Sequence, residues 1–299
     1  MRKLVLIHGR SQQLKDAAKL KQEWVDALHA GLRSADADLD IPDEQIRFPY
    51  YGQTLYELVT NSTVKAADVV VKGNVSSVEQ DFIGAALNDV VASAGISEED
   101  ILAAAEDPSQ ISKDVQNLPW VLAALRAIDR VPGLSAVSIA LATRDVYRYV
   151  RNPGIQVVIE DGVRQAFTAR REVEESVVVA HSLGSVIAYS MLKREGKMHQ
   201  WKVPALITVG SPLGINAIHR LLSPIGRPDC LGDWYNAYDN QDVVALHPLD
   251  DVYFPVTPGI ENYDQVKNPT PNKHGISGYL GDPIVARRIR DALLDGAPG

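Results

Sequence analysis

Residues Ser176 to Leu192 read SVVVAHSLGSVIAYSML, and this stretch decides the fold that we expect. It begins with a run of small and β-branched apolar residues, which is typical of a buried strand in a parallel sheet. A helical pattern follows almost at once. The turn between the two has small residues at Ala180 and Gly184, with Ser182 between them. Strand, sharp turn and helix with a serine at the tip is the sequence form of a nucleophile elbow.

An elbow of this kind gives Ser182 a chemical role. Ala180 and Gly184 let the strand and the helix approach closely, so the serine hydroxyl is exposed on a strained backbone. The backbone N–H of Leu183, at the helix N-terminus, then faces an oxyanion that develops beside the serine. We therefore interpret Ser182 as a nucleophile. The alternative is a buried serine in an ordinary strand-to-helix turn.

Composition limits the classes of protein and partner. The chain has 299 residues, of which 45% are hydrophobic and 23% charged, so it has room for a large core. Its net charge of −8 and the lack of a long basic run make nucleic acid or an anionic membrane surface an unexpected partner. The single cysteine, Cys230, rules out an internal disulfide. We expect a cytoplasmic protein.

Other motifs are missing from the sequence. It has no apolar run of the roughly 18 residues that a membrane span needs, so we expect no transmembrane segment. It also has no zinc-binding His-Glu-x-x-His, no cysteine cluster, no P-loop and no dinucleotide-binding glycine pattern. We therefore expect no metal and no cofactor.

The chain divides by pattern into a core and an insert. Strand signals fall in residues 1–51 and 151–299, at 3–7, 45–48, 176–181, 205–209, 234–238 and 261–266. Helical signals in this part fall at 14–33, 154–171 and 184–194, and another helix starts at Asp282. Residues 52–150 instead carry helical patterns at 55–71, 76–94, 97–106, 118–130 and 134–151. We expect an α/β fold whose mostly parallel sheet is flanked by helices, with 52–150 as a helical cap.

A serine nucleophile needs a base and an acid later in the chain, in the order Ser, Asp, His. Of the histidines, His247 and His274 follow a candidate acid. His274 is favoured because it lies in a loop between the expected last strand and last helix. Asp239 and Asp242 both follow the expected strand at 234–238. We favour Asp242, which lies within the loop, and keep Asp239 as the alternative.

With these residues the chain resembles the α/β-hydrolase superfamily of serine hydrolases, of the lipase and esterase type. The elements that carry the resemblance are LIHG at 6–9, AHSLG at 180–184, GSPLG at 210–214, DVV at 242–244 and His274. It looks most like the bacterial lipase-like or PGAP1-like branch. The resemblance implies an α/β-hydrolase fold and backbone oxyanion donors at Gly9, Arg10 and Leu183. His8 is interpreted as a structural residue that orients the oxyanion loop.

The function that we expect is hydrolysis of an acyl ester through Ser182, His274 and Asp242, by way of an acyl-enzyme. The substrate is a small-molecule or lipid ester, and the cap walls the pocket above the serine. One alternative uses the same triad on a thioester, an amide or in acyl transfer. Another is a non-catalytic, hydrolase-like scaffold that binds a partner. The pattern leaves the acyl chain length and the oligomeric state open.

Overall fold

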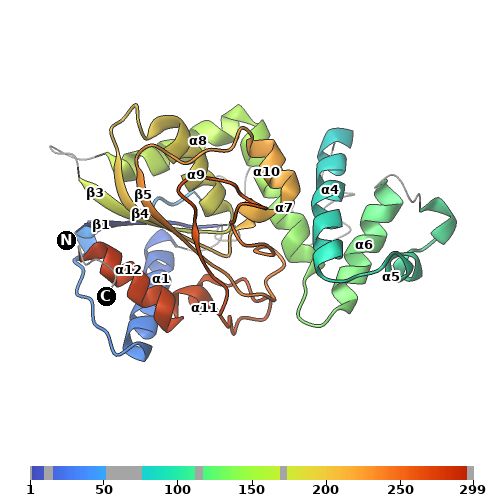
Figure 1. Cartoon of the computed structure of the whole chain (residues 1–299), viewed down its shortest axis with the longest axis horizontal. Helices are drawn as coiled ribbons and strands as arrows, with labels where there is room; N and C mark the ends of the chain where they lie inside the picture. The colour runs from blue at the N-terminus through green and yellow to red at the C-terminus, as the bar shows by residue number, and fades with distance from the viewer. Residues whose placement is uncertain (1, 10–15, 52–75, 112–116, 169–173, 295–299) are drawn as a thin grey trace.

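A computed structural model describes residues 2–9, 16–51, 76–111, 117–168 and 174–294. Within these residues the chain builds one open sheet of six strands, with helices on both faces (Figure 1). The strands are β1 (Lys3–Ile7), β2 (Ile46–Arg47), β3 (Glu175–His181), β4 (Lys202–Val209), β5 (Leu231–Ala237) and β6 (Glu261–Tyr263). Every neighbouring pair is parallel. The expected α/β class is confirmed.

The strand order creates one special position in the sheet. The order is β2-β1-β3-β4-β5-β6, so the chain first moves outward from β1 to β2 and later returns to the other side of β1 as β3. In open α/β sheets, ligands bind outside the carboxyl ends of the strands at such a reversal. Gly9 follows β1 and Ser182 follows β3. The candidate nucleophile Ser182 therefore lies at the carboxyl ends of β1 and β3, where the strand order reverses.

Both faces of the sheet are buried, which explains the continuous apolar strands. Leu4 and Leu6 belong to one apolar cluster, whereas Val5 and Ile7 belong to a second one on the opposite face. The first face is covered by α1 (Ala17–Ser34), α11 (Ile276–Leu280) and α12 (Pro283–Leu293), and the second by α8 (Pro153–Phe167) and α9 (Leu183–Glu195) (Figure 1). Strands that are covered on both sides have no polar face to alternate with.

The helices expected between β2 and β3 are present where the structure describes the chain. They are α4 (Ser77–Ser93), α5 (Glu98–Ala104), α6 (Leu118–Arg130) and α7 (Ala136–Arg151). The Ser97 and Asp100 side chains form a capping box at the start of α5, as the acidic first turn indicates. The helix expected at 55–71 lies outside the described residues. In Figure 1, α4, α5 and α6 stand to one side of the sheet, and α7 leads back to it.

The structure adds two short helices that we did not expect. They are α11 and α10 (Asn216–Leu222), which lie in segments that carry no helical periodicity long enough to detect. β6 ends at Tyr263 instead of continuing to 266, and Gln265 forms only an isolated antiparallel bridge with Asp239. None of the helices in the described ranges is long and apolar enough to cross a membrane.

Gly184 is a position where neighbouring backbone leaves no room for a side chain. A Cβ atom there would lie 2.2 Å from the carbonyl oxygen of Ile7 and 2.7 Å from that of His8. Backbone atoms cannot rotate away as a side chain can. We predict that Gly184→Ala lowers the free energy of unfolding by about 2 kcal/mol, as overpacking does. Urea denaturation measures the change.

Gly162→Ala is the matched control, because a Cβ at that α8 position meets nothing within 4 Å. A helical glycine without a steric role costs about 0.5–1 kcal/mol relative to alanine, so this variant should be slightly more stable than the wild type. If Gly184→Ala is also as stable as the wild type, the close contact between β1 and α9 is not a constraint.

Candidate active site

The Ser182 backbone has the conformation that an elbow requires. β3 ends at His181 and α9 begins at Leu183, and between them Ser182 has φ 54° and ψ −128°. A non-glycine residue rarely adopts positive φ, and such strain costs about 1–3 kcal/mol. It persists only where the surroundings determine it. The serine itself is buried, with 4% of its surface exposed.

Three neighbours hold this strained residue. The Ser182 N–H donates to the carbonyl oxygen of Val209, at the end of β4 (3.2 Å). The Ser185 hydroxyl donates to the Ser182 carbonyl oxygen (2.6 Å) and lies 2.7 Å from the Ser211 hydroxyl. On the other side is Gly9, where a Cβ would come within 2.7 Å of the Ser182 Cβ. The turn is thus fixed from β1, β4 and α9 together.

Ser182, His274 and Asp242 lie in one hydrogen-bonded chain. His274 Nε2 is 2.9 Å from Ser182 Oγ, and His274 Nδ1 is 2.7 Å from Asp242 Oδ2. A carboxylate can only accept, so Nδ1–H donates to Asp242 and Nε2 is left to accept the serine proton. This arrangement can remove the proton from a serine hydroxyl. The structure brings these three residues together as the sequence predicts; their catalytic role stays a prediction.

Asp242 is fully buried, and its carboxylate is satisfied by three donors. Its Oδ1 accepts the Val244 N–H (2.9 Å), and its Oδ2 accepts the Tyr279 hydroxyl (2.6 Å) as well as His274. A buried charge without such partners would be costly. The hydrogen bonds also fix the orientation of the carboxylate, so that Oδ2 faces the imidazole.

Asp239, the alternative acid, has a different place. Its Oδ1 accepts the Gln241 N–H (2.8 Å) and its Oδ2 accepts the Asn268 N–H (2.6 Å). The Asn268 amide in turn donates to the carbonyl oxygen of Gly275 (2.8 Å), next to His274. Asp239 therefore helps to hold the loop that carries the histidine, whereas Asp242 contacts the imidazole itself.

His247, the alternative base, lies elsewhere. Its ring stacks on Tyr253, with centroids 3.9 Å apart and planes 9° apart. Its Nε2 lies 3.4 Å from the Ser93 hydroxyl at the end of α4. Burial lowers the pKa of His247, although Asp89 and Asp250 oppose this effect. The residue joins α4 to the loop after β5.

Two of the three expected oxyanion donors lie beside the serine. Leu183 is the first residue of α9, where N–H groups have no intrahelical acceptor. Gly9 follows β1 and packs against the Ser182 side chain. Arg10 lies outside the described residues. A helix N-terminus and an adjacent strand end can together stabilise negative charge at this position.

Two buried histidines, His181 and His8, lie near the hydrogen-bonded residues Ser182, His274 and Asp242. The His181 Nε2–H donates to the His274 carbonyl oxygen (2.8 Å), and the two rings are 4.7 Å apart. Burial, and then His274, lowers the pKa of His181 well below its usual value, so the ring stays neutral. Burial also lowers the pKa of His8 to about 4. Neither ring adds a positive charge next to His274 near neutral pH.

His8 holds the turn that carries Gly9. Its Nε2 accepts the Tyr51 N–H (3.2 Å), so Nδ1–H donates to the Gly9 carbonyl oxygen (2.7 Å). The Tyr51 ring stacks on the imidazole, with centroids 4.0 Å apart, and its hydroxyl donates to the His8 carbonyl oxygen. His8 thus acts on the conformation of the Gly9 turn, as its structural interpretation predicts.

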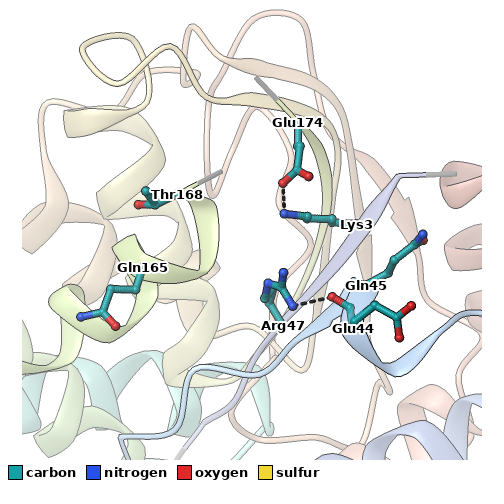
Figure 2. A pocket seen from close by; sticks show the side chains of 7 residues that line it. All are labelled: Lys3, Glu44, Gln45, Arg47, Gln165, Thr168 and Glu174. Atoms are coloured by element: carbon teal, nitrogen blue, oxygen red, sulfur yellow. Dashed lines mark hydrogen bonds and ion pairs between the residues drawn. The ribbon is translucent and has the colours of Figure 1, made fainter. Parts of the chain in front are cut away.

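A polar cavity lies at the opposite edge of the sheet. It has a volume of about 540 Å³ and lies near the amino ends of β1 and β3 (Figure 2). Its walls hold two cations and two carboxylates, and Lys3 pairs with Glu174 across it. Arg47 donates to the Glu44 carbonyl oxygen (2.5 Å). The charges balance within the wall, so we assign the cavity no role in the chemistry at Ser182.

Comparison with known proteins adds no family assignment. No family model matches the chain, and no curated protein does either. Across the residues that the structure describes, no group of three or more His, Cys, Asp or Glu side chains could hold a metal ion. The functional interpretation therefore rests on the geometry of this chain.

Sequence reasoning missed Tyr279 and Asn268. Tyr279 contacts Asp242, and Asn268 links Asp239 to the histidine loop. Neither residue belongs to a local motif. Their contacts join segments that are 29 and 37 residues apart, so only the folded chain reveals them.

The two aspartates make a sharp test of the site. We predict that Asp242→Asn lowers the rate of the Ser182 reaction by about three to four orders of magnitude, because the amide favours the wrong imidazole tautomer. Asp239→Asn keeps one acceptor oxygen and should cost stability more than rate. The inactivation rate with a fluorophosphonate and the thermal unfolding midpoint are measured for both variants. If Asp239→Asn loses most of the inactivation rate and Asp242→Asn loses little, Asp239 is the acid and Asp242 holds the loop.

Proposed function

We propose that this protein is a serine hydrolase of the α/β-hydrolase type that cleaves an acyl ester. The observation that carries the proposal is the hydrogen-bonded chain from Asp242 through His274 to Ser182, with contacts of 2.7 and 2.9 Å. It stands at the carboxyl edge of a parallel sheet, where the strand order reverses and ligands bind. The substrate is a small-molecule or lipid ester.

The first half-reaction follows from the tautomer. Ser182 Oγ attacks the ester carbonyl carbon while His274 Nε2 takes its proton. The carbonyl oxygen becomes an oxyanion, which the Leu183 N–H and the Gly9 turn stabilise. Asp242 stabilises the imidazolium that forms. His274 then returns the proton to the leaving alcohol, and the acyl group stays on the serine.

The second half-reaction repeats these steps with water. His274 takes a proton from a water molecule as its oxygen attacks the acyl carbon. The tetrahedral intermediate collapses, the acid leaves, and Ser182 regains its proton from His274. A thioester or an amide can enter the same cycle, and an alcohol in place of water would give acyl transfer. A panel of esters, thioesters and amides of one acyl group separates these reactions.

A non-catalytic scaffold accounts less well for the same features. Ser182 carries a strained backbone, and Asp242 buries a carboxylate; both cost stability. Partner binding makes no use of either feature. Such costs are typical of functional sites, where the strain is part of the mechanism.

The nucleophile gives the direct test of the proposal. We predict that the wild type reacts covalently with a fluorophosphonate and that Ser182→Ala does not, because the hydroxyl oxygen is the attacking atom. His274→Ala should lower the reaction rate by at least about a thousandfold, since triad members act as a unit. Intact-protein mass spectrometry detects the adduct.

Ser190→Ala is the matched control for this test. Ser190 lies on the same helix, and its buried hydroxyl has no hydrogen-bond partner among the described residues. The control should react as the wild type does. Labelling of Ser182→Ala at the wild-type rate would remove the serine from the mechanism and with it the proposed function.

The cap is proposed to wall the acyl pocket, and one contact supports this part. The Ser138 hydroxyl on α7 accepts a hydrogen bond from the Asn272 side chain (3.4 Å), two residues before His274. The start of α7 therefore lies beside the loop that carries the base. Leu141 lies on the same side of the helix as Ser138 by helical spacing, and it is half-buried.

We predict that Leu141→Gln weakens turnover of long acyl esters about tenfold more than that of acetate esters, because only a long chain reaches the helix. Comparing kcat/KM for acetate and octanoate esters of one alcohol measures the difference. Val78→Gln on α4 is the control, since that side chain is 61% exposed. An equal loss on both esters means that α7 only stabilises the fold.

A further inference from the structure

Tyr279 contacts the candidate acid in addition to His274. It lies on α11, five residues after His274, and its side chain is fully buried. Its hydroxyl donates to Asp242 Oδ2 (2.6 Å), the same oxygen that accepts His274 Nδ1–H (2.7 Å). The phenol oxygen in turn accepts the Asp239 N–H (3.3 Å). One carboxylate oxygen is thus shared between a phenol and an imidazole.

We propose that Tyr279 is a positioning residue that holds the Asp242 carboxylate against His274 and limits how tightly that carboxylate binds the imidazolium. The inference rests on the proposed function, since it assigns a role within the same reaction. The Tyr279 hydroxyl touches neither the serine nor the imidazole, so it acts on His274 through Asp242, while the Asp239 N–H that it accepts helps to hold the hydroxyl in place.

The physical argument concerns the charge on Oδ2. A hydrogen bond from a neutral donor stabilises the carboxylate and weakens its attraction for a nearby cation. Without the phenol, Oδ2 would bind the imidazolium alone and more strongly. His274 would then keep its extra proton to higher pH, and less of it would be neutral and able to act as a base. The phenol therefore widens the pH range in which the base is ready.

The phenol itself stays protonated over this range. Burial, and then the charge of Asp242, raises the pKa of Tyr279 well above its usual value. The hydroxyl therefore keeps its proton near neutral pH and donates to Asp242. Tyr279 is a fixed donor and not a proton carrier.

Other titratable groups around the pair are His181 at the end of β3, His8 directly after β1, and Asp239 in the loop after β5. His181 and His8 are neutral near pH 7, because burial lowers the pKa of both. The Asp239 carboxylate accepts the N–H groups of Gln241 and Asn268. Removing the phenol hydroxyl therefore changes the hydrogen bonding of Asp242 and of the Asp239 N–H, without changing the charge around them.

The test is Tyr279→Phe, read by the second-order rate of fluorophosphonate inactivation as a function of pH. This readout needs no knowledge of the natural ester. We expect the acid limb of the profile to move up by about 0.5 to 1 pH unit. We also expect the rate on the plateau to fall about tenfold, because the carboxylate loses an orienting hydrogen bond.

Tyr149→Phe is the matched control. Tyr149 is also fully buried and donates to a carboxylate oxygen at the same distance, 2.6 Å, but its partner is Glu160. The control should leave the acid limb where it is in the wild type. A loss of rate in both variants without a shift would mean that the two phenols only support packing.

A second variant keeps the hydroxyl in place and tests the direction in which the acid limb moves. Site-specific 3,5-difluorotyrosine at position 279 is a stronger donor than tyrosine, so the acid limb should move to lower pH. This variant also decides the question if Tyr279→Phe does not fold. A reactive wild type whose acid limb is unchanged by either substitution overturns the inference alone. A wild type that reacts at no pH overturns the proposed function, and this inference with it.

Discussion

The close approach of β1 to the turn between β3 and α9 is the constraint on which the rest of the site depends. The carbonyl oxygens of Ile7 and His8 occupy the space that a side chain at position 184 would need, and the Ser182 side chain occupies that of position 9. This contact leaves the serine backbone with φ 54° as the conformation that fits between the two strands and the helix. Because β3 lies between β1 and β4, the turn is also tied to Val209. The strained conformation of Ser182 is thus held by contacts with two strands of the sheet and with α9.

The same arrangement explains the electrostatics around the serine. The loops that follow β5 and β6 bring Asp242 and His274 to the edge where β1 and β3 end. Asp242 is buried, so water screens its charge less and it acts more strongly on its neighbours. The neighbouring rings of His181 and His8 are held neutral by burial. Among the described residues, the Asp242 carboxylate is therefore held by hydrogen bonds from Val244, Tyr279 and His274, and in the proposed reaction its charge attracts the imidazolium.

The sequence predicts much of this fold because its strongest signals are local. The β3 run, the small residues around Ser182 and the caps at Ser97 and Asp282 each lie within a few residues, and the structure has a strand, a turn and helix starts at these positions. No local pattern in the sequence distinguishes Asp239 from Asp242. The two residues are three positions apart and both are buried, and only long-range contacts to Asn268 and His274 separate them. Arg10 and the helix expected at 55–71 lie outside the described residues, so both stay predictions.

The packing of α4, α5, α6 and α7 determines which of these helices can move at the least cost. α7 shares its apolar cluster with α8, α9 and one face of the sheet. α4 is tied to α7 by Arg148 and Glu79 (2.8 Å) and to the start of α10 by Asp89, which accepts the Asn216 N–H (2.8 Å). Moving either helix would break partly buried polar contacts and expose core residues. The main contacts of α5 and α6 are with each other and with α4 and α7. Movement is therefore least costly in α5 and α6, whereas α7 is held against α8 and α9 and lies beside the loop that carries His274.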